Sequence, residues 1–173
     1  MFKIRKMPVK ISLTELEWEI VKLLAADRNS KARAIGYYRD PGNRNDPDEI
    51  EIRGVAAELA FCKFINVYPA RTLNRVIDRD PDLILNGKTV DIKGTGAVEN
   101  DLMVSMEVNH KHDIYVVLAV IRPDAFYLGY SLGEILFKED QIYYPAPKNG
   151  NKRTPFYRVL NRELKNDDFW NGG

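Results

Sequence analysis

The chain has 173 residues, which is enough for one domain with a substantial core and short for two. Hydrophobic residues make up 45% and charged residues 29%, and 26 Lys and Arg against 25 Asp and Glu leave a net charge of +1. Overall charge therefore does not indicate a nucleic-acid-binding protein, and any basic surface has to be local.

The single cysteine, Cys62, excludes an intrachain disulfide and favours a cytoplasmic location. The longest apolar run, residues 114–121, is too short to cross a membrane, so we expect no membrane association.

The first predicted elements are helical. Ser12 followed by Glu15 matches a capping box and predicts a helix over residues 12–34. Residues 36–49 are rich in Gly, Pro, Asn and Asp and predict a loop. A second helix is predicted over about residues 49–66, where apolar side chains recur at helical spacing.

The rest of the chain is mostly predicted as strands. The predicted strands cover residues 72–77, 82–85, 88–93, 113–121 and 125–131. Residues 101–112 fit a short strand or a short helix, a short helix is predicted near 131–137, and the Pro-rich tail is expected to be irregular. This order predicts an α/β fold in which a central mixed β-sheet is flanked by helices.

One predicted hairpin carries an unusual set of charges. Asn86-Gly87 between two apolar runs is a strong signal for a two-residue type I′ turn. That turn would place Asp82 opposite Asp91, with Cβ atoms ~5 Å apart and both side chains on one face. Lys93 would lie on the same face, one step beyond Asp91.

Two explanations fit such a cluster. Like charges that face each other destabilise a sheet, so either Lys93 compensates them as an ion-pair partner or a cation such as Mg²⁺ lies between them. Glu58 bears on this choice because it lies on the apolar side of the second helix, where a carboxylate is costly unless it is paired or binds a metal. Its partner would be either a buried Lys or Arg, with Lys93 as one candidate, or the same metal as the hairpin acids.

In this order, the helix acid and the hairpin resemble the PD-(D/E)XK nuclease superfamily, which has a restriction-endonuclease-like core and many phage and bacterial members. Pro81-Asp82 matches the PD element, Asp91-Ile92-Lys93 matches (D/E)XK, and Glu58 matches the acid of the first core helix. The resemblance covers about residues 49–137. Members often carry a further Gln or Lys after the third strand, a place that Lys111 would fill here.

The resemblance implies one nuclease domain over residues 1–173, with the helix 12–34 and the tail 138–173 added to the core. It implies a DNA nuclease that hydrolyses phosphodiester bonds with Mg²⁺ or Mn²⁺, as a monomer or a homodimer. Asp82, Asp91, the Ile92 carbonyl and Glu58 would hold the metal, and Lys93 would orient or deprotonate the attacking water or stabilise the transition state.

DNA binding would depend on local basic residues. The candidates are Lys3, Arg5, Lys6, Lys10, Arg39, Arg44, Lys148, Lys152, Arg153, Arg158 and Arg162. A non-catalytic DNA-binding or assembly module that retains the nuclease fold is the alternative function. A third possibility is an unrelated α/β domain with an accidental D-x-K.

Overall fold

The computed structural model describes residues 7–36, 46–74, 80–107, 110–147 and 150–171. Its helices are α1 (Glu15–Ala34), α2 (Pro47–Phe64), α3 (Ala70–Asn74) and α4 (Gly133–Leu136), with 3-10 turns at Glu139–Gln141, Asn161–Glu163 and Phe169–Asn171. Its strands are β1 (Val9–Ser12), β2 (Leu83–Leu85), β3 (Lys88–Thr95), β4 (Leu102–Ser105), β5 (Ile114–Ile121), β6 (Asp124–Leu132), β7 (Ile142–Tyr143) and β8 (Phe156–Val159).

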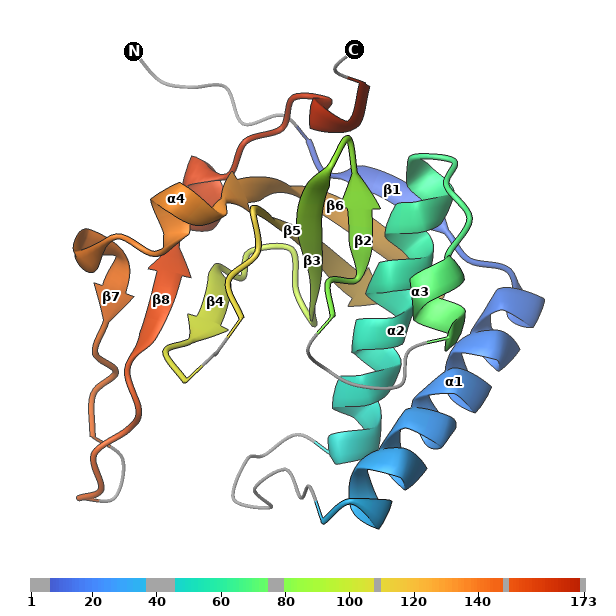
Figure 1. Ribbon diagram of the computed structural model, residues 1–173, viewed down its shortest axis with the longest axis horizontal. Helices are drawn as coiled ribbons and strands as arrows, with labels where there is room; N and C mark the ends of the chain where they lie inside the picture. Colours follow the sequence, from blue (N-terminus) through green and yellow to red (C-terminus); the bar gives the residue numbers. More distant parts are fainter. Residues whose placement is uncertain (1–6, 37–45, 75–79, 108–109, 148–149, 172–173) are drawn as a thin grey trace.

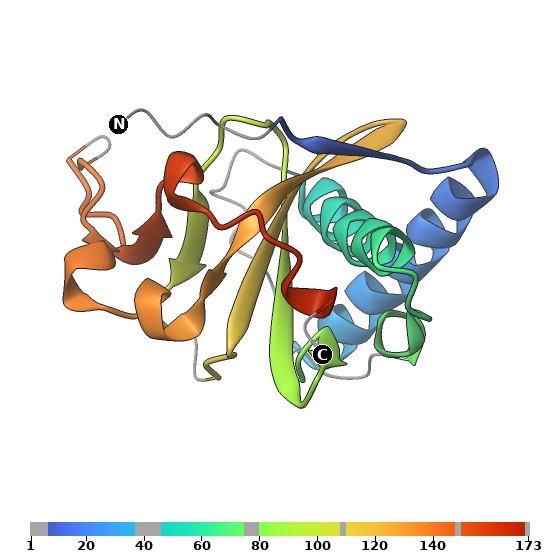
Figure 2. The same ribbon diagram turned by 90° about the horizontal axis from the view of Figure 1, so that it is seen from above.

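A mixed five-stranded sheet lies at the centre, with the strand order β1-β6-β5-β3-β2. Strands β3 and β5 are parallel, and the other neighbours are antiparallel. Helices α1, α2 and α3 cover one face, and a three-stranded antiparallel sheet (β4-β8-β7) lies on the other side with α4 (Figures 1 and 2). The α/β class and the central mixed sheet are thus confirmed, while the second face is covered largely by strands.

Strand β5 is buried on both faces, which explains its uninterrupted apolar run. Successive side chains of a strand point to opposite faces, so β5 contributes to two separate cores. Ile114, Val116 and Leu118 pack in the core beneath the helices. Tyr115, Val117 and Ala119 pack in a second core beneath the smaller sheet.

The start of α1 differs from the prediction. The capping box is formed by Thr14, whose hydroxyl accepts a hydrogen bond from the Glu17 N–H at 3.2 Å, while the Glu17 carboxylate accepts one from the Thr14 N–H at 2.6 Å. Ser12 instead ends β1, where its hydroxyl donates to Asp124 of β6 at 2.8 Å. Both residue pairs match the capping-box pattern, and the pairing of β1 with β6 decides which of them caps the helix.

Two further predictions were wrong about local structure. Within the predicted strand 72–77, the described residues belong to helix α3, which follows Pro69 and packs on α2. The predicted irregular tail contains β7 and β8, and β8 pairs with β4, which lies in the segment that fitted a strand or a helix. Short segments with weak local preferences take the structure that their tertiary partners impose.

Both segments outside the family resemblance contribute to the sheets. Strand β1 forms one edge of the central sheet by pairing with β6, and β8 is the middle strand of the smaller sheet. The C-terminal stretch adds Phe169 and Trp170, which pack against the core beneath the helices. These additions therefore pack directly on the segment that carries the predicted site.

Candidate functional site

The β2–β3 hairpin has the predicted turn and register. Asn86 and Gly87 have positive φ of 48° and 75°, and Leu83 faces Val90 across the two strands. The pairing stops there, so Asp82 and Asp91 do not form the fourth cross-strand pair that the sequence predicts. Instead, the Asp82 carboxylate accepts a hydrogen bond of 2.6 Å from the backbone N–H of Ile92. Asp82 therefore contacts the peptide that joins Asp91 to Ile92.

Asp91 and Lys93 lie on the face of β3 that is turned away from the helices. Val90 and Ile92 pack in the core beneath the helices, and the alternation of the strand turns Asp91 and Lys93 to the opposite side. Asp91 is only 7% exposed, yet its Oδ2 atom has no hydrogen-bond partner in the part of the chain that the structure describes. The Lys93 ammonium lies 2.8 Å from that oxygen and forms an ion pair whose geometry does not meet that of a hydrogen bond.

Tyr115 of β5 lies beside Asp91 in the parallel β3–β5 pair. Burial raises the pKa of the Tyr115 hydroxyl, and the negative charge of Asp91 raises it further, while Lys93 lowers it. The Tyr115 hydroxyl also accepts a hydrogen bond of 3.1 Å from the His112 N–H, which lowers the same pKa. These interactions agree with a common face for Asp91, Lys93 and Tyr115.

Glu58 is held by an arginine from the neighbouring helix. Arg28 of α1 donates two hydrogen bonds of 2.8 Å to the two carboxylate oxygens of Glu58, and a third of 3.0 Å to the Thr72 carbonyl. Glu51 lies 3.5 Å from the same guanidinium. The side chains of Arg28 and Glu58 are 12% and 4% exposed. Of the two alternatives for Glu58, the structure shows the pair with a buried basic residue, which is Arg28 and not Lys93.

The charges around Glu58 place Asp82 near the same helix residues. Burial lowers the pKa of Arg28, but the hydrogen bonds and charge of Glu58 outweigh it and raise that pKa overall, with smaller contributions from Glu51 and Asp82. Burial, followed by the charges of Glu58 and Asp82, raises the pKa of the Cys62 thiol to about 12. Glu58 and Asp82 therefore act on the same two side chains, whereas Asp91 acts on Tyr115.

The residues of the predicted site thus lie in two groups. Glu58 pairs with Arg28 on the helix side of β3, and Asp91 pairs with Lys93 on the opposite side of that strand. Asp82 contacts the backbone of β3. Within the described residues, no group of three or more His, Cys, Asp or Glu side chains is arranged to hold a metal ion. The hairpin oxygens still suit Mg²⁺, which takes one or two carboxylates and keeps several waters. Among these oxygens, Oδ2 of Asp91 has no hydrogen-bond partner within the described residues, and it forms the ion pair with Lys93.

The predicted basic residues have varied surroundings. Lys10 pairs with Asp124 at 2.8 Å, and Arg158 lies 3.5 Å from Asp101. Lys152, Arg153 and Arg162 are exposed. The other candidates lie outside the described residues, namely Lys3, Arg5, Lys6, Arg39, Arg44 and Lys148.

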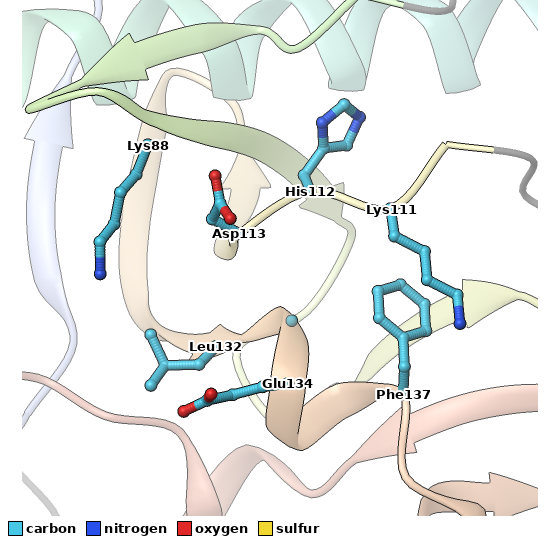
Figure 3. Close-up of a pocket in the computed structure, with 8 residues that line it drawn as sticks. Lys88, Lys111, His112, Asp113, Leu132, Glu134 and Phe137 are labelled. Atoms are coloured by element: carbon cyan, nitrogen blue, oxygen red, sulfur yellow. The ribbon is translucent and has the colours of Figure 1, made fainter.

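A cavity of about 380 Å³ opens near the turn end of the hairpin (Figure 3). It is lined by Lys88, Lys111, His112, Asp113, Leu132, Gly133, Glu134 and Phe137. Lys111 lies over the Phe137 ring at 4.7 Å, and Asp113 accepts two hydrogen bonds of 2.8 Å from Thr89. The lining has both charges and contains none of the predicted metal-binding residues.

Sequence reasoning missed Arg28, although a signal for it exists. Arg28 continues the stripe of Trp18, Val21 and Ala25, the buried residues of α1, at intervals of three and four residues. An arginine on a buried stripe requires an acid, and Glu58 is the acid on the apolar side of the next helix. The two expectations together would have predicted the pair.

No family model matches the chain, and no curated protein and no solved structure matches it. No helix of the described part is both long and apolar enough to cross a membrane.

Proposed function

We propose that the protein is a metal-dependent DNA nuclease of the PD-(D/E)XK type, with a restriction-endonuclease-like core. The observation that carries the proposal is the arrangement on β3. The nearly buried Asp91 carboxylate keeps an oxygen without a hydrogen bond from any described residue, and a lysine ammonium lies 2.8 Å away. A buried carboxylate oxygen without a hydrogen bond is costly, so functional sites are where such atoms are retained.

In this proposal, Asp91, Asp82 and the Ile92 carbonyl would hold Mg²⁺ or Mn²⁺, and Lys93 would contact the reacting phosphate. The bound ion would lower the pKa of a water molecule and offset charge on the phosphate. Asp82 keeps its position through the 2.6 Å hydrogen bond from Ile92, which fixes the carboxylate relative to Asp91. The half-exposed Lys93 ammonium would donate hydrogen bonds to a phosphate oxygen and stabilise the negative charge of the transition state.

Glu58 enters the proposal as the charge partner of Arg28. Its two carboxylate oxygens already accept two hydrogen bonds, and the pair ties α1 to α2 and, through the Thr72 carbonyl, to α3. This connection fixes the helix layer behind β3. Glu58 would therefore position the site from behind, through the packing of α2 on β3.

The test is incubation of the protein with labelled single- and double-stranded DNA in Mg²⁺, Mn²⁺ or EDTA. We expect cleavage with either metal and none in EDTA. Lys93→Met should lower the cleavage rate ~100-fold, and Lys31→Met, an equal change at an exposed lysine of α1, should leave the rate unchanged. Cleavage that persists in EDTA, or an equal loss in both lysine variants, would contradict the proposal.

A non-catalytic DNA-binding module is the second candidate. It is favoured by the two hydrogen bonds that Arg28 donates to Glu58, because they occupy the acid that the family uses on its first core helix. This candidate predicts DNA binding that is equal in Mg²⁺ and EDTA, with no cleavage in either. The same incubation therefore separates the two functions.

A further inference from the structure

The outer face of the smaller sheet carries aromatic and basic side chains. Leu102, Val104, Tyr157 and Val159 of this sheet belong to the core beneath it. The register then turns the other side chains outward, and they come from all three strands. The outward set is Met103 and Ser105 of β4, Phe156 and Arg158 of β8, and Tyr143 of β7.

Three of these side chains form a stack. Tyr143 and Phe156 face each other across β7 and β8 with ring centroids 5.2 Å apart, and the Arg158 guanidinium lies 4.3 Å from the Tyr143 ring centroid. Tyr143 is 39% exposed and Met103 is 54% exposed. Flat rings of this kind on an open sheet are surfaces on which nucleobases stack.

The charge of this region differs from that of the whole chain. Residues 141–162 contain five basic residues, namely Lys148, Lys152, Arg153, Arg158 and Arg162, and no acidic residue. Acidic residues also border the face. Asp101 lies 3.5 Å from Arg158, the N–H of Glu107 donates to the Ser105 hydroxyl at 3.2 Å, Glu139 and Asp140 precede β7, and Glu163 follows Arg162. In a protein with a net charge of +1, this segment is a local positive surface that complements a polyanion.

We propose that the outer face of β4, β8 and β7 binds single-stranded DNA, with Tyr143 and Phe156 stacking on bases and Lys152 and Arg153 contacting phosphates. Unpaired bases expose the ring faces that this surface can stack on, whereas duplex bases already stack on their neighbours. The positive charge argues against an apolar protein partner for the exposed rings. The choice of DNA rests on the proposed nuclease function.

This face lies next to the strand that carries Asp91 and Lys93. Strand β4 follows β3 in the chain, and it is the strand of the smaller sheet that lies closest to β3 (Figure 1). It is also an edge strand of that sheet. A single strand bound on the outer face would pass around the β4 edge to reach the β3 acids.

The test is fluorescence anisotropy with a labelled oligothymidine of about 15 nucleotides and with a duplex of equal length, both in EDTA. We expect tighter binding of the single strand. Tyr143→Ala should weaken that binding ~10-fold because a stacking ring is removed. Tyr68→Ala, which removes an exposed tyrosine between α2 and α3, should leave it unchanged.

A second variant, with a matched control, tests the phosphate contacts without changing any core residue. Lys152→Ala with Arg153→Ala should reduce the dependence of log affinity on log salt by about 0.7 for each phosphate that the variant no longer neutralises. Lys31→Ala with Arg33→Ala, on exposed side chains of α1, should leave that dependence unchanged. Equal affinity for duplex and single strand, or unchanged binding by both Tyr143→Ala and the Lys152/Arg153 variant, would overturn the inference.

Because EDTA prevents metal-dependent cleavage, DNA binding is measured independently of cleavage. The binding-face proposal and the nuclease proposal can therefore be contradicted separately. Single-strand binding that is weakened by Tyr143→Ala, in a protein that cleaves nothing with Mg²⁺ or Mn²⁺, would contradict the nuclease proposal and support the binding face. Cleavage together with unchanged binding by Tyr143→Ala and the Lys152/Arg153 variant would support the nuclease proposal and contradict the binding face.

Discussion

The charged pairs on the two sides of β3 differ in how completely they are hydrogen-bonded. On the helix side, Glu58 and Arg28 form a buried pair with two hydrogen bonds of 2.8 Å, and Arg28 has a further bond to the Thr72 carbonyl. On the other side, Asp91 and Lys93 form an ion pair in which Oδ2 has no hydrogen bond from the described residues and the lysine side chain is 41% exposed. We call the first the saturated pair and the second, because of that one carboxylate oxygen, the open pair.

This difference separates a structural role from a chemical one. A buried ion pair with its hydrogen bonds satisfied resists the loss of either partner, because the remaining charge is left without compensation. A buried carboxylate oxygen without a hydrogen bond costs stability and does not add to it, and a cation or a reacting group can use that oxygen. We therefore infer that the Glu58–Arg28 pair stabilises the fold, and we propose the Asp91–Lys93 pair for the chemistry.

The sharpest way to break this comparison is to remove one partner of the saturated pair. Glu58→Ala leaves the Arg28 charge buried, so we expect the free energy of unfolding to fall by about 3–5 kcal/mol. Urea denaturation followed by circular dichroism measures it. The double variant Arg28→Met with Glu58→Leu removes both charges and should recover most of that loss. Equal losses in the single and double variants would contradict a role for the pair.

The next largest change in the free energy of unfolding is expected where β3 packs closely on α2. A Cβ at Gly94 would meet the Arg53 carbonyl oxygen at 2.6 Å, so Gly94→Ala must move the helix and should lower the free energy of unfolding by about 1–3 kcal/mol. Gly54 lies inside α2 with nothing within 4 Å of an added Cβ, so Gly54→Ala should raise it by about 0.5–1 kcal/mol. Thermal melting of both variants measures the difference, and a shared sign would contradict it.

The buried Cys62 thiol on the helix side predicts that the free energy of unfolding falls at alkaline pH. Burial and the charges of Glu58 and Asp82 raise the pKa of Cys62 from 9.0 to about 12, so the folded state favours the neutral thiol. That contribution is complete below pH 9 and falls as pH rises toward 12, by about 1.4 kcal/mol per pH unit. Urea denaturation at pH 8 and pH 10 should therefore show a smaller loss for Cys62→Ala than for the original protein.

Keeping these measurements at or below pH 10 limits the contribution of the buried tyrosines to the change in stability. Burial raises the pKa of Tyr127 and Tyr130 from 10.0, so their contributions have the same sign and begin at higher pH. Identical pH dependence with and without Cys62 would show that its thiol titrates as in the unfolded chain.

The smallest effect on stability is expected at the open pair. Asp91→Asn keeps the shape of the side chain and removes a charge whose Oδ2 has no hydrogen bond from the described residues. Because its ion-pair partner Lys93 is 41% exposed and stays solvated, the free energy of unfolding should change by less than about 1 kcal/mol. Thermal melting beside Glu58→Ala measures this contrast. A loss as large as that of Glu58→Ala would make the two pairs equivalent and remove the basis for assigning them different roles.

The hairpin was predictable because its signals are local. Asn86-Gly87 selects the turn, and the turn fixes the register of the strands on either side. The contact of Asp82 with the Ile92 N–H was not predictable from alternation, because β2 begins only at Leu83 and its pairing ends before Asp82. The α/β class followed from the order of strong helix and strand patterns.

The missed features depend on residues far apart in the chain. Arg28 and Glu58 are 30 positions apart and meet only because α1 packs on α2. Strand β8 forms against β4, more than 50 positions earlier, and a four-residue strand has little preference of its own. Within the described residues 72–74, helix α3 stands in place of the predicted strand and packs on α2, a contact that the local sequence does not indicate.

We propose that the open pair on β3 carries the chemistry, and the cleavage rate of Asp91→Asn is the decisive measurement of that role. The rate is measured on labelled DNA with Mg²⁺ or Mn²⁺, at a temperature where melting shows both proteins folded. The account predicts a loss of at least ~100-fold with the melting temperature nearly unchanged. Cleavage at the original rate by folded Asp91→Asn would contradict it.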